Sequence, residues 1–205
     1  MHISKLEIEN FRSLKKEIIE FHSGINVIIG HNNVGKTNVI KALSLILNSN
    51  RTKRLDINDI NQNFSEEEIK KEAPKVTISI YFNESEKEEE FSEDLVLAST
   101  WLTKLEKPYE AKLTYEFFLP EREQEDYQNK LMEINTTNDD WKEKFWKMLE
   151  HNFLRKYIYK IYVGNPEQKV VVDSESINKI DFQFIDAIRD ASRDLLSGKN
   201  SLLKD

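Results

Sequence analysis

Four residues of this sequence match, in type and spacing, a loop that binds phosphate groups. Gly30, Gly35, Lys36 and Thr37 fit the pattern G-x-x-x-x-G-K-[ST] completely, within IIGHNNVGKTN. Glycine is scarce here, with five in 205 residues, yet two of the five fall at this spacing. An apolar run ends at Gly30 and a pattern of helical spacing follows Lys36, which is the context that the motif requires. We therefore interpret the stretch as a phosphate-binding loop rather than a chance string.

Each part of such a loop has a role that a triphosphate requires. Glycines let successive N–H groups point at phosphate oxygens, and the following helix N-terminus adds its positive dipole end. Lys36 is predicted to reach the β- and γ-phosphates, so it is our candidate catalytic residue. The Thr37 hydroxyl is predicted to hold Mg²⁺. The cofactors expected from the loop are therefore ATP and Mg²⁺.

The other candidate nucleotide contacts in the loop are Asn32, Asn33, Val34 and Asn38. Asn32 has two readings that the sequence leaves open. Its side chain can hydrogen-bond near the γ-phosphate or the attacking water, or it can simply tolerate a left-handed turn conformation.

Strands and a helix must position this loop. Ile3, Leu6 and Ile8 alternate with polar residues and predict a strand, and EIIEF predicts a second one. The run INVIIG is typical of a strand buried on both faces. After Lys36 the apolar spacing predicts a helix that ends near residues 48–50. The first 47 residues thus predict strands that lead through a glycine turn into a helix.

The rest of the chain predicts a second, β-rich region. KVTISIYF (75–82) and EAKLTYEFFL (110–119) alternate as strands do, and KYIYKIYV and QKVVVD flank the turn sequence GNPE as a hairpin. Helical spacing is found over 93–106 and over 139–155, where an aromatic stripe is predicted to be core rather than a base-stacking surface. FQFIDAIRDASRDLLSGKN predicts a last helix, with Gly198 as its C-cap.

Composition narrows the class of protein. The net charge of −7 is not the basic footprint of a nucleic-acid binder, and both the acidic run 83–94 and the basic run 51–54 are predicted to be solvated loops. The absence of cysteine excludes disulfides and thiolate metal sites, and the four histidines lack metal-ligand spacing. We expect no leader, no membrane contact and a cytoplasmic location.

The residues LEIENFRSL, followed by GHNNVGKTN, resemble the N-terminus of the ABC-type ATPase heads of the SMC, RecF and OLD (overcoming lysogenization defect) group. Asn33-Val34 stands where the repair and chromosome heads usually carry Gly-Ser. This form is similar to OLD-family ATP-dependent endonucleases, including Gabija-type defence proteins. IDAIRDASRDL, near the end of the chain, also resembles a segment of OLD heads.

This resemblance implies an α/β fold of the P-loop NTPase class, of ABC-ATPase head type. A mixed sheet would surround the P-loop, with an antiparallel β-rich lobe and inserted helices beside it. Residues 1–205 would form the N-terminal portion of one head. Its parts would be the strand-loop-helix core (1–50), the β-rich lobe (51–180) and a helix leading to a further portion (181–205).

The resemblance also implies a function for the whole protein, namely an OLD-like ATP-dependent DNA endonuclease in phage defence or DNA processing. ATP would control head engagement and a downstream Toprim domain would cut DNA. The implied partners are DNA, a second head in a homodimer or higher homo-oligomer, and an accessory defence protein. Two alternatives stay open: an SMC/RecF-like repair head without nuclease activity, and a non-hydrolysing, nucleotide-gated protein-interaction module.

By position, the resemblance makes Arg12 of NFRS a candidate nucleotide contact, although it can equally brace the strand turn. Asp59 and Gln62 are the two candidates for assisting Mg²⁺ or water, and either can instead cap a loop. Arg189 and Arg193 favour surface ion pairs at helical spacing over a role in an active site.

Two parts of a complete site of this type are not visible in the sequence. No apolar strand ends in Asp-Glu, and LLSGKN is better explained as a helix C-cap than as a signature loop. The chain alone is therefore expected to hydrolyse ATP poorly.

Overall fold

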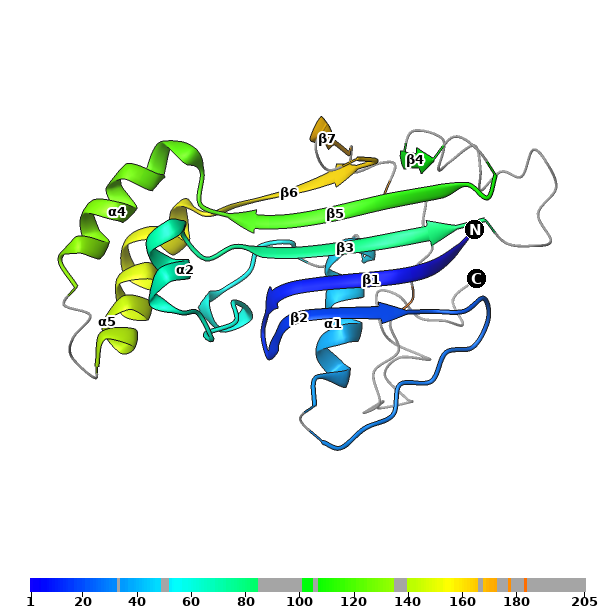
Figure 1. The fold of residues 1–205 in the computed structure, drawn as a ribbon, viewed down its shortest axis with the longest axis horizontal. Coiled ribbons are helices and arrows are strands. Elements are labelled where there is room, and N and C mark those ends of the chain that lie inside the picture. Colours follow the sequence, from blue (N-terminus) through cyan, green and yellow to red (C-terminus); the bar gives the residue numbers. More distant parts are fainter. Residues whose placement is uncertain are drawn as a thin grey trace, which may run out of the picture.

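The computed structural model describes residues 1–32, 34–48, 52–84, 101–104, 107–134, 140–165, 168–172, 177 and 183. Within these residues, no helix has both the length and the apolar character that crossing a membrane requires. The structure is a long antiparallel sheet with one helix across a face and a group of helices at one end (Figure 1).

The described strands form a seven-stranded sheet in the order β2-β1-β3-β5-β6-β7, with β4 also paired to β5, and every described pair is antiparallel. The strands are β1 (His2–Phe11), β2 (Leu14–Glu20), β3 (Val76–Asn83), β4 (Leu102–Lys104), β5 (Glu110–Phe118), β6 (Ile158–Val163) and β7 (Val170–Val171). The expected α/β class with an antiparallel β-rich region is confirmed. Because no described strands pair in parallel, the mixed part of the expected sheet stays a prediction.

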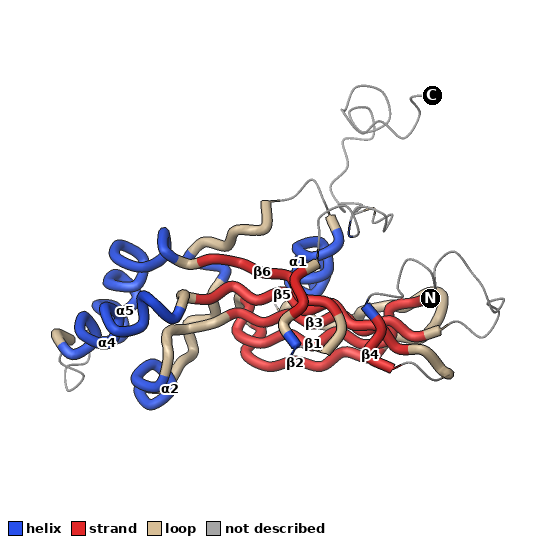
Figure 2. Tube along the Cα trace, turned by 90° about the horizontal axis from the view of Figure 1, so that it is seen from above, coloured by secondary structure: helices blue, strands red, loops and turns tan. Residues whose placement is uncertain are grey.

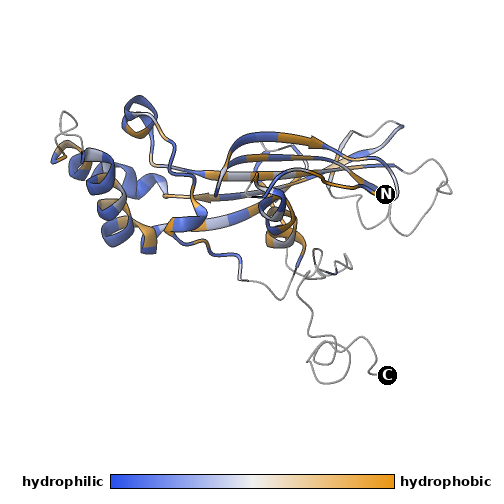
Figure 3. Cartoon of the chain, turned by 90° about the horizontal axis from the view of Figure 1, so that it is seen from below, coloured by the Kyte–Doolittle hydropathy of each residue, from blue (hydrophilic) through white to orange (hydrophobic). Residues whose placement is uncertain are grey.

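Alternation of residue type decides which face of the sheet is buried. Leu6, Ile8, Ile78 and Ile80 are fully buried, and their polar neighbours point to the opposite face. Figure 3 shows this alternation as orange and blue bands along the strands. The apolar face of the sheet therefore forms one side of the hydrophobic core.

Helix α1 (Lys36–Leu47) lies across that apolar face (Figure 2). It buries residues all along its length after the first turn, including Val39, Ala42 and Ile46, in the same core as the sheet residues. The packing of α1 thus fixes where the loop before it begins.

A group of helices covers the end of the sheet where β3 begins and β5 ends (Figure 1). Its elements are η1 (Ile57–Asp59), α2 (Glu66–Lys71), η3 (Glu121–Glu123), α4 (Gln124–Met132), α5 (Trp141–Met148), the π-helix η4 (Leu149–Phe153) and η5 (Leu154–Lys156). Tyr127 is buried among Phe145 and Phe153, with ring centroids 6.5 and 5.8 Å away. The prediction that the aromatic stripe of 139–155 is core is confirmed.

The basic run at 51–54 is a loop, as its charge predicted, in its described residues 52–54, and Thr52 and Arg54 are exposed, but Lys53 is half-buried. The Lys53 ammonium donates to the carbonyls of Leu45, Ile46 and Asn48, the last turn of α1, at 2.7 to 3.0 Å. Arg54 likewise donates to the carbonyls of Leu154 and Arg155 at 2.9 and 2.8 Å. Cations favour the negative end of a helix, so these two residues terminate helical segments rather than face solvent alone.

Two other expected elements are not formed in this structure. Residues 25–30 form no strand and are exposed, although their apolar run predicted a strand buried on both faces. The helix expected over 93–106 is replaced at Leu102–Lys104 by β4, and most of its remaining residues lie outside the described part. The cause in both cases is tertiary, because strand pairing depends on partners that a local pattern does not contain.

Several predictions fall outside the described residues. They are the last helix with Gly198, Arg189 and Arg193, the site residue Asn33, and nearly all of the acidic run 83–94. The boundaries at residues 50 and 180 also stay predictions.

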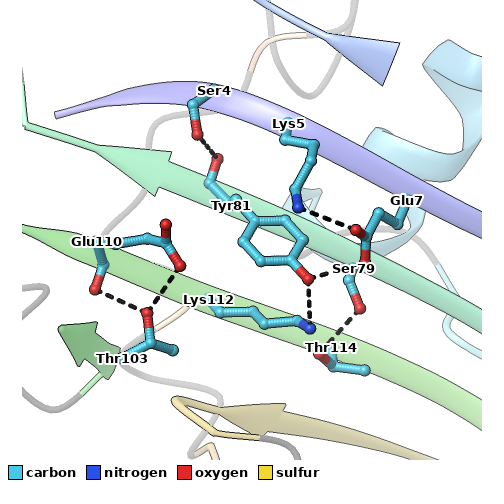
Figure 4. A network of polar contacts seen from close by, with 9 residues as sticks. All are labelled: Ser4, Lys5, Glu7, Ser79, Tyr81, Thr103, Glu110, Lys112 and Thr114. Carbon is cyan, nitrogen blue, oxygen red and sulfur yellow. Dashed lines mark hydrogen bonds and ion pairs between the residues drawn. The ribbon is translucent and has the colours of Figure 1, made fainter. Parts of the chain in front are cut away.

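The polar face of the sheet carries a connected set of side chains (Figure 4). The Tyr81 hydroxyl donates to Glu7 at 2.8 Å and accepts from the Lys112 ammonium at 2.6 Å, while Lys5 pairs with Glu7 at 3.0 Å. Burial works against ionisation of Glu7, but the hydrogen bonds from Lys5 and Tyr81 outweigh it and lower its pKa. Burial lowers the pKa of Lys112 and, with the bond to Glu7, raises that of Tyr81.

The lowered pKa of Glu7 makes a prediction about stability and pH. A carboxylate whose pKa falls on folding stabilises the fold above its unfolded value of about 4.3, and this contribution is lost as the pH falls through the folded-state pKa. We expect Glu7→Gln to cost about 1 kcal/mol at pH 7 and to reduce the loss of stability on acidification. Urea unfolding at pH 7 and below pH 4 measures both effects. Glu9→Gln, on the same strand face, is the control; an equal effect of both variants would contradict the assignment to Glu7.

Candidate nucleotide-binding site

Gly35 joins the candidate loop to α1, because it is the N-cap residue of that helix. Its φ is 97°, in the left-handed region that glycine adopts at low cost. A Cβ at this position would lie 2.7 Å from Leu14 Cδ2 and 3.3 Å from Ser13 Oγ. The second glycine of the motif is therefore required both by the backbone conformation and by the close approach of the turn between β1 and β2.

The first turn of α1 is free to receive an anion. It contains no acidic residue and no side chain caps it, so within the described part of the loop and first turn no carboxylate offsets the positive end of the helix dipole. Lys36 lies over the loop, where its ammonium donates to the carbonyls of Gly30 and His31, each at 2.6 Å. Thr37 and Asn32 are exposed, and Val34 is 55% exposed.

The turn that follows β1 packs against this loop. Ser13 Oγ accepts a hydrogen bond from Asn38 Nδ2 at 2.9 Å, and Leu14 fills the space beside Gly35. Arg12 precedes these two contact residues in the chain. The structure thus places the NFRS turn beside Gly35 and Asn38, although some 20 residues separate the two segments. Contact of Arg12 itself with a nucleotide stays a prediction.

Arg12 is held by a second segment. Its Nε and Nη2 atoms donate to Asp59 Oδ1 at 2.8 and 2.7 Å, and the Asp59 side chain is only 12% exposed. Asp59 also accepts a hydrogen bond from the N–H of Asp56 in a capping box. Its carboxylate therefore already caps the loop and pairs with Arg12. Gln62, the other candidate, is exposed.

The sequence patterns missed two polar residues of this site, Ser13 and Asn61. Asn61 is 6% exposed and donates through its side chain to the Arg12 carbonyl at 2.5 Å. Neither residue belongs to the motif, and each acts through a contact between segments that are distant in sequence. An asparagine two positions after Asp59 carries no signal of its own.

The residues present fit a Mg²⁺-nucleotide. Lys36 places a cation at the loop, Thr37 presents a hydroxyl in the first helical turn, and no carboxylate in that turn repels phosphate. The P-loop, helix and antiparallel sheet together define a P-loop ATPase domain.

Comparison with known proteins gives the family. The model of the AAA ATPase domain matches residues 1–205, the whole chain, so the protein belongs to this family. Among curated proteins, 81 residues are 38% identical to the DNA double-strand break repair Rad50 ATPase of Sulfurisphaera tokodaii, which covers 40% of this chain and 8% of that protein. A stretch of 46 residues is 37% identical to the DNA replication and repair protein RecF of Bifidobacterium longum subsp. infantis, which covers 22% of this chain and 11% of that protein. The matches therefore span only a small part of these relatives.

Solved structures that resemble the chain include an SMC ATPase studied for its ATP-driven dimerization and DNA-stimulated activation. It is 17% identical with a TM-score of 0.43, over 88% of this chain and 77% of that one. An SMC head bound to the C-terminal winged-helix domain of ScpA is 18% identical with the same TM-score, over 88% of this chain and 39% of that one.

The close contact at Gly35 leads to a prediction, for which Gly24 provides the control. Gly24 has nearly the same φ, 93°, but a Cβ there would meet nothing within 4 Å. Each change to alanine costs about 1–2 kcal/mol for the left-handed backbone. We expect Gly35→Ala to cost more than Gly24→Ala in thermal unfolding and to abolish Mg-ATP binding, whereas Gly24→Ala leaves binding intact. Equal effects on unfolding and binding would show that the contact with Leu14 does not matter.

Proposed function

We propose that this chain is the ATP-binding N-terminal portion of an ATPase head that acts on DNA. The observation that carries the proposal is the complete phosphate loop at a helix start with no internal counter-charge, and the turn of NFRS docked directly against it. Family membership supports ATP as the nucleotide. Activity on DNA is supported by the curated relatives, which are named for DNA repair and replication.

Each part of the loop has its own role in binding Mg-ATP. Backbone N–H groups at the start of α1 bind phosphate oxygens, and Lys36 exchanges the carbonyls of Gly30 and His31 for the β- and γ-phosphates. Thr37 would hold Mg²⁺, which would supply neutralisation of phosphate charge. Arg12 contacts the nucleotide from the neighbouring turn.

Head engagement accounts for the exposure of the loop. Asn32, Val34 and Thr37 face solvent in the described part of the chain, so the nucleotide would be covered on one side only. A second copy placed over the loop would complete the site and exclude water, as phosphoryl transfer requires. We therefore expect hydrolysis to depend on protein concentration.

Residues 25–29 supply a second argument for a larger head. Ile25, Val27 and Ile29 are 95, 77 and 88% exposed, directly before the loop. An apolar run that is typical of a buried strand, but pairs with no described strand, needs strands from elsewhere. We propose that sequence outside residues 1–205 supplies them and forms the parallel part of the sheet.

Two forms of the whole protein remain. A repair-type head without nuclease activity is favoured by the Rad50 and RecF relatives, and a downstream coiled coil would mark it. An OLD-like endonuclease is favoured by Asn33-Val34 in the loop, and a downstream Toprim domain would mark it. The intact mass and sequence of the native protein, captured from its source cells with an antibody against this chain, decide between them.

Lys36 provides the direct test of nucleotide binding. We expect Lys36→Ala to remove most Mg-ATP affinity, by roughly a hundredfold or more, because it deletes the cation aimed at two phosphates. The melting temperature should change little, since the two hydrogen bonds of Lys36 are exposed. Titration calorimetry with Mg-ATP measures the affinity. Lys16→Ala, which removes an exposed lysine of β2, is the control, and normal affinity in Lys36→Ala would sink the phosphate-loop assignment.

Hydrogen exchange tests the proposed role of residues 25–29. In the native protein, purified at its natural length, we expect these amides to exchange at least about a hundredfold more slowly than in residues 1–205 alone, because strand pairing protects amides. Exchange at the same fast rate in both samples would show that no strand pairs with this segment. The amides of β1, paired on both sides, serve as the internal reference.

A further inference from the structure

The turn after β1 has a backbone that needs outside support. Asn10 and Arg12 have φ of 58° and 52°, left-handed values that are uncommon for residues other than glycine. Such conformations persist only where the surroundings hold them, and they concentrate at functional sites. Here the two residues flank Phe11, which is fully buried and anchors the end of β1.

Residues 59–61 supply that support through hydrogen bonds to the backbone of the turn. The Arg12 N–H donates to the Asp59 carbonyl at 2.9 Å, and the Arg12 carbonyl accepts from Asn61 Nδ2. The N–H of Asn61 donates to the Asn10 carbonyl at 2.8 Å, and Phe11 forms an isolated bridge with Ile60. The backbone of the turn is thus fixed from one side by three consecutive residues.

The Arg12 side chain is fixed by the same segment. Asp59 Oδ1 accepts from both Nε and Nη2, while Asp59 Oδ2 accepts from the Asp56 N–H at 3.2 Å. Charge-assisted hydrogen bonds of this kind are strong and set the orientation of the guanidinium plane. They leave the two N–H groups of Nη1 and one N–H of Nη2 without a bond to Asp59, and these are the donors that would be offered to a phosphate oxygen.

We propose that Asp59 is a positioning residue, which acts through Arg12 to hold that guanidinium for the nucleotide, rather than a ligand of Mg²⁺. The inference rests on the proposed nucleotide site. Asp59 and Asn61 form a clamp that keeps the Arg12 turn beside Gly35 and Asn38, so the cost of ordering the arginine is met before ATP arrives.

The test compares Mg-ATP affinity in the native protein and in four variants: Arg12→Ala, Asp59→Asn, the double variant, and Asp56→Asn. Asp56 lies in the same loop and caps η1 through its side chain, a role that asparagine fills equally well. Asp56→Asn therefore removes the same charge from the same loop without touching Arg12, and serves as the matched control.

We expect Arg12→Ala and Asp59→Asn each to weaken binding about tenfold, the low end for partners that orient a contacting group. Asp56→Asn should bind as the native protein does. The double variant should bind no more weakly than Arg12→Ala alone, because Asp59 has nothing left to position. Additive losses, about a hundredfold in the double variant, would overturn the proposal and indicate an independent role such as Mg²⁺ binding.

Two further readouts distinguish a clamp from a role in folding and from competition with the nucleotide. A role in folding alone predicts a lower melting temperature for Asp59→Asn with affinity unchanged at temperatures where it is folded, and this outcome overturns the proposal. Tighter binding by Asp59→Asn also overturns it, since Asp59 would then compete with the nucleotide for Arg12. Loss of binding in Lys36→Ala with native binding in Asp59→Asn would overturn the clamp and leave the nucleotide site standing, whereas native binding in Lys36→Ala would overturn the site itself.

Discussion

The apolar face of the antiparallel sheet has to be hidden from water, and α1 is the element that lies across it. Leu6 and Ile8 of β1 and Ala42 and Ile46 of α1 are fully buried in one core. Burial of this kind is worth about 25 cal/mol per Å² of apolar surface and is not directional. The position of α1 on the sheet is set at its start, where Gly35 lies so close to Leu14 that no side chain would fit.

The same elements stabilise the core and position the candidate site. The helix that covers the apolar face also starts at the candidate phosphate loop, and the turn that contacts Gly35 also carries Arg12. The sheet therefore positions a loop in which Asn32, Val34 and Thr37 are exposed. The helical end of the sheet is fastened to the same region, since Lys15 pairs with Glu68 at 2.9 Å and lies over the ring of Phe64.

Local patterns in the sequence predicted much of this molecule. Strict alternation identified β1, β3 and β5, spacing identified α1 and α5, and the motif located the loop because it fixes residue type at each position. The failures have a common cause. Residues 25–30 and 102–104 depend on which strands are available to pair, and Lys53 and Arg54 bond to helix ends that are distant from them in the local pattern. The engagement of Asp59 with Arg12 joins positions 47 residues apart, a distance over which spacing carries no information.

The order of the strands has a consequence for how the chain acquires its fold. β1 and β2 are joined by a tight turn and can pair as soon as both exist, but the other neighbour of β1 is β3, more than sixty residues further along. Closing that distance carries an entropic cost before any contact repays it, and topologies of this kind fold slowly. On the ribosome, the phosphate loop and the apolar residues before it would emerge well ahead of the strands that build the rest of the sheet.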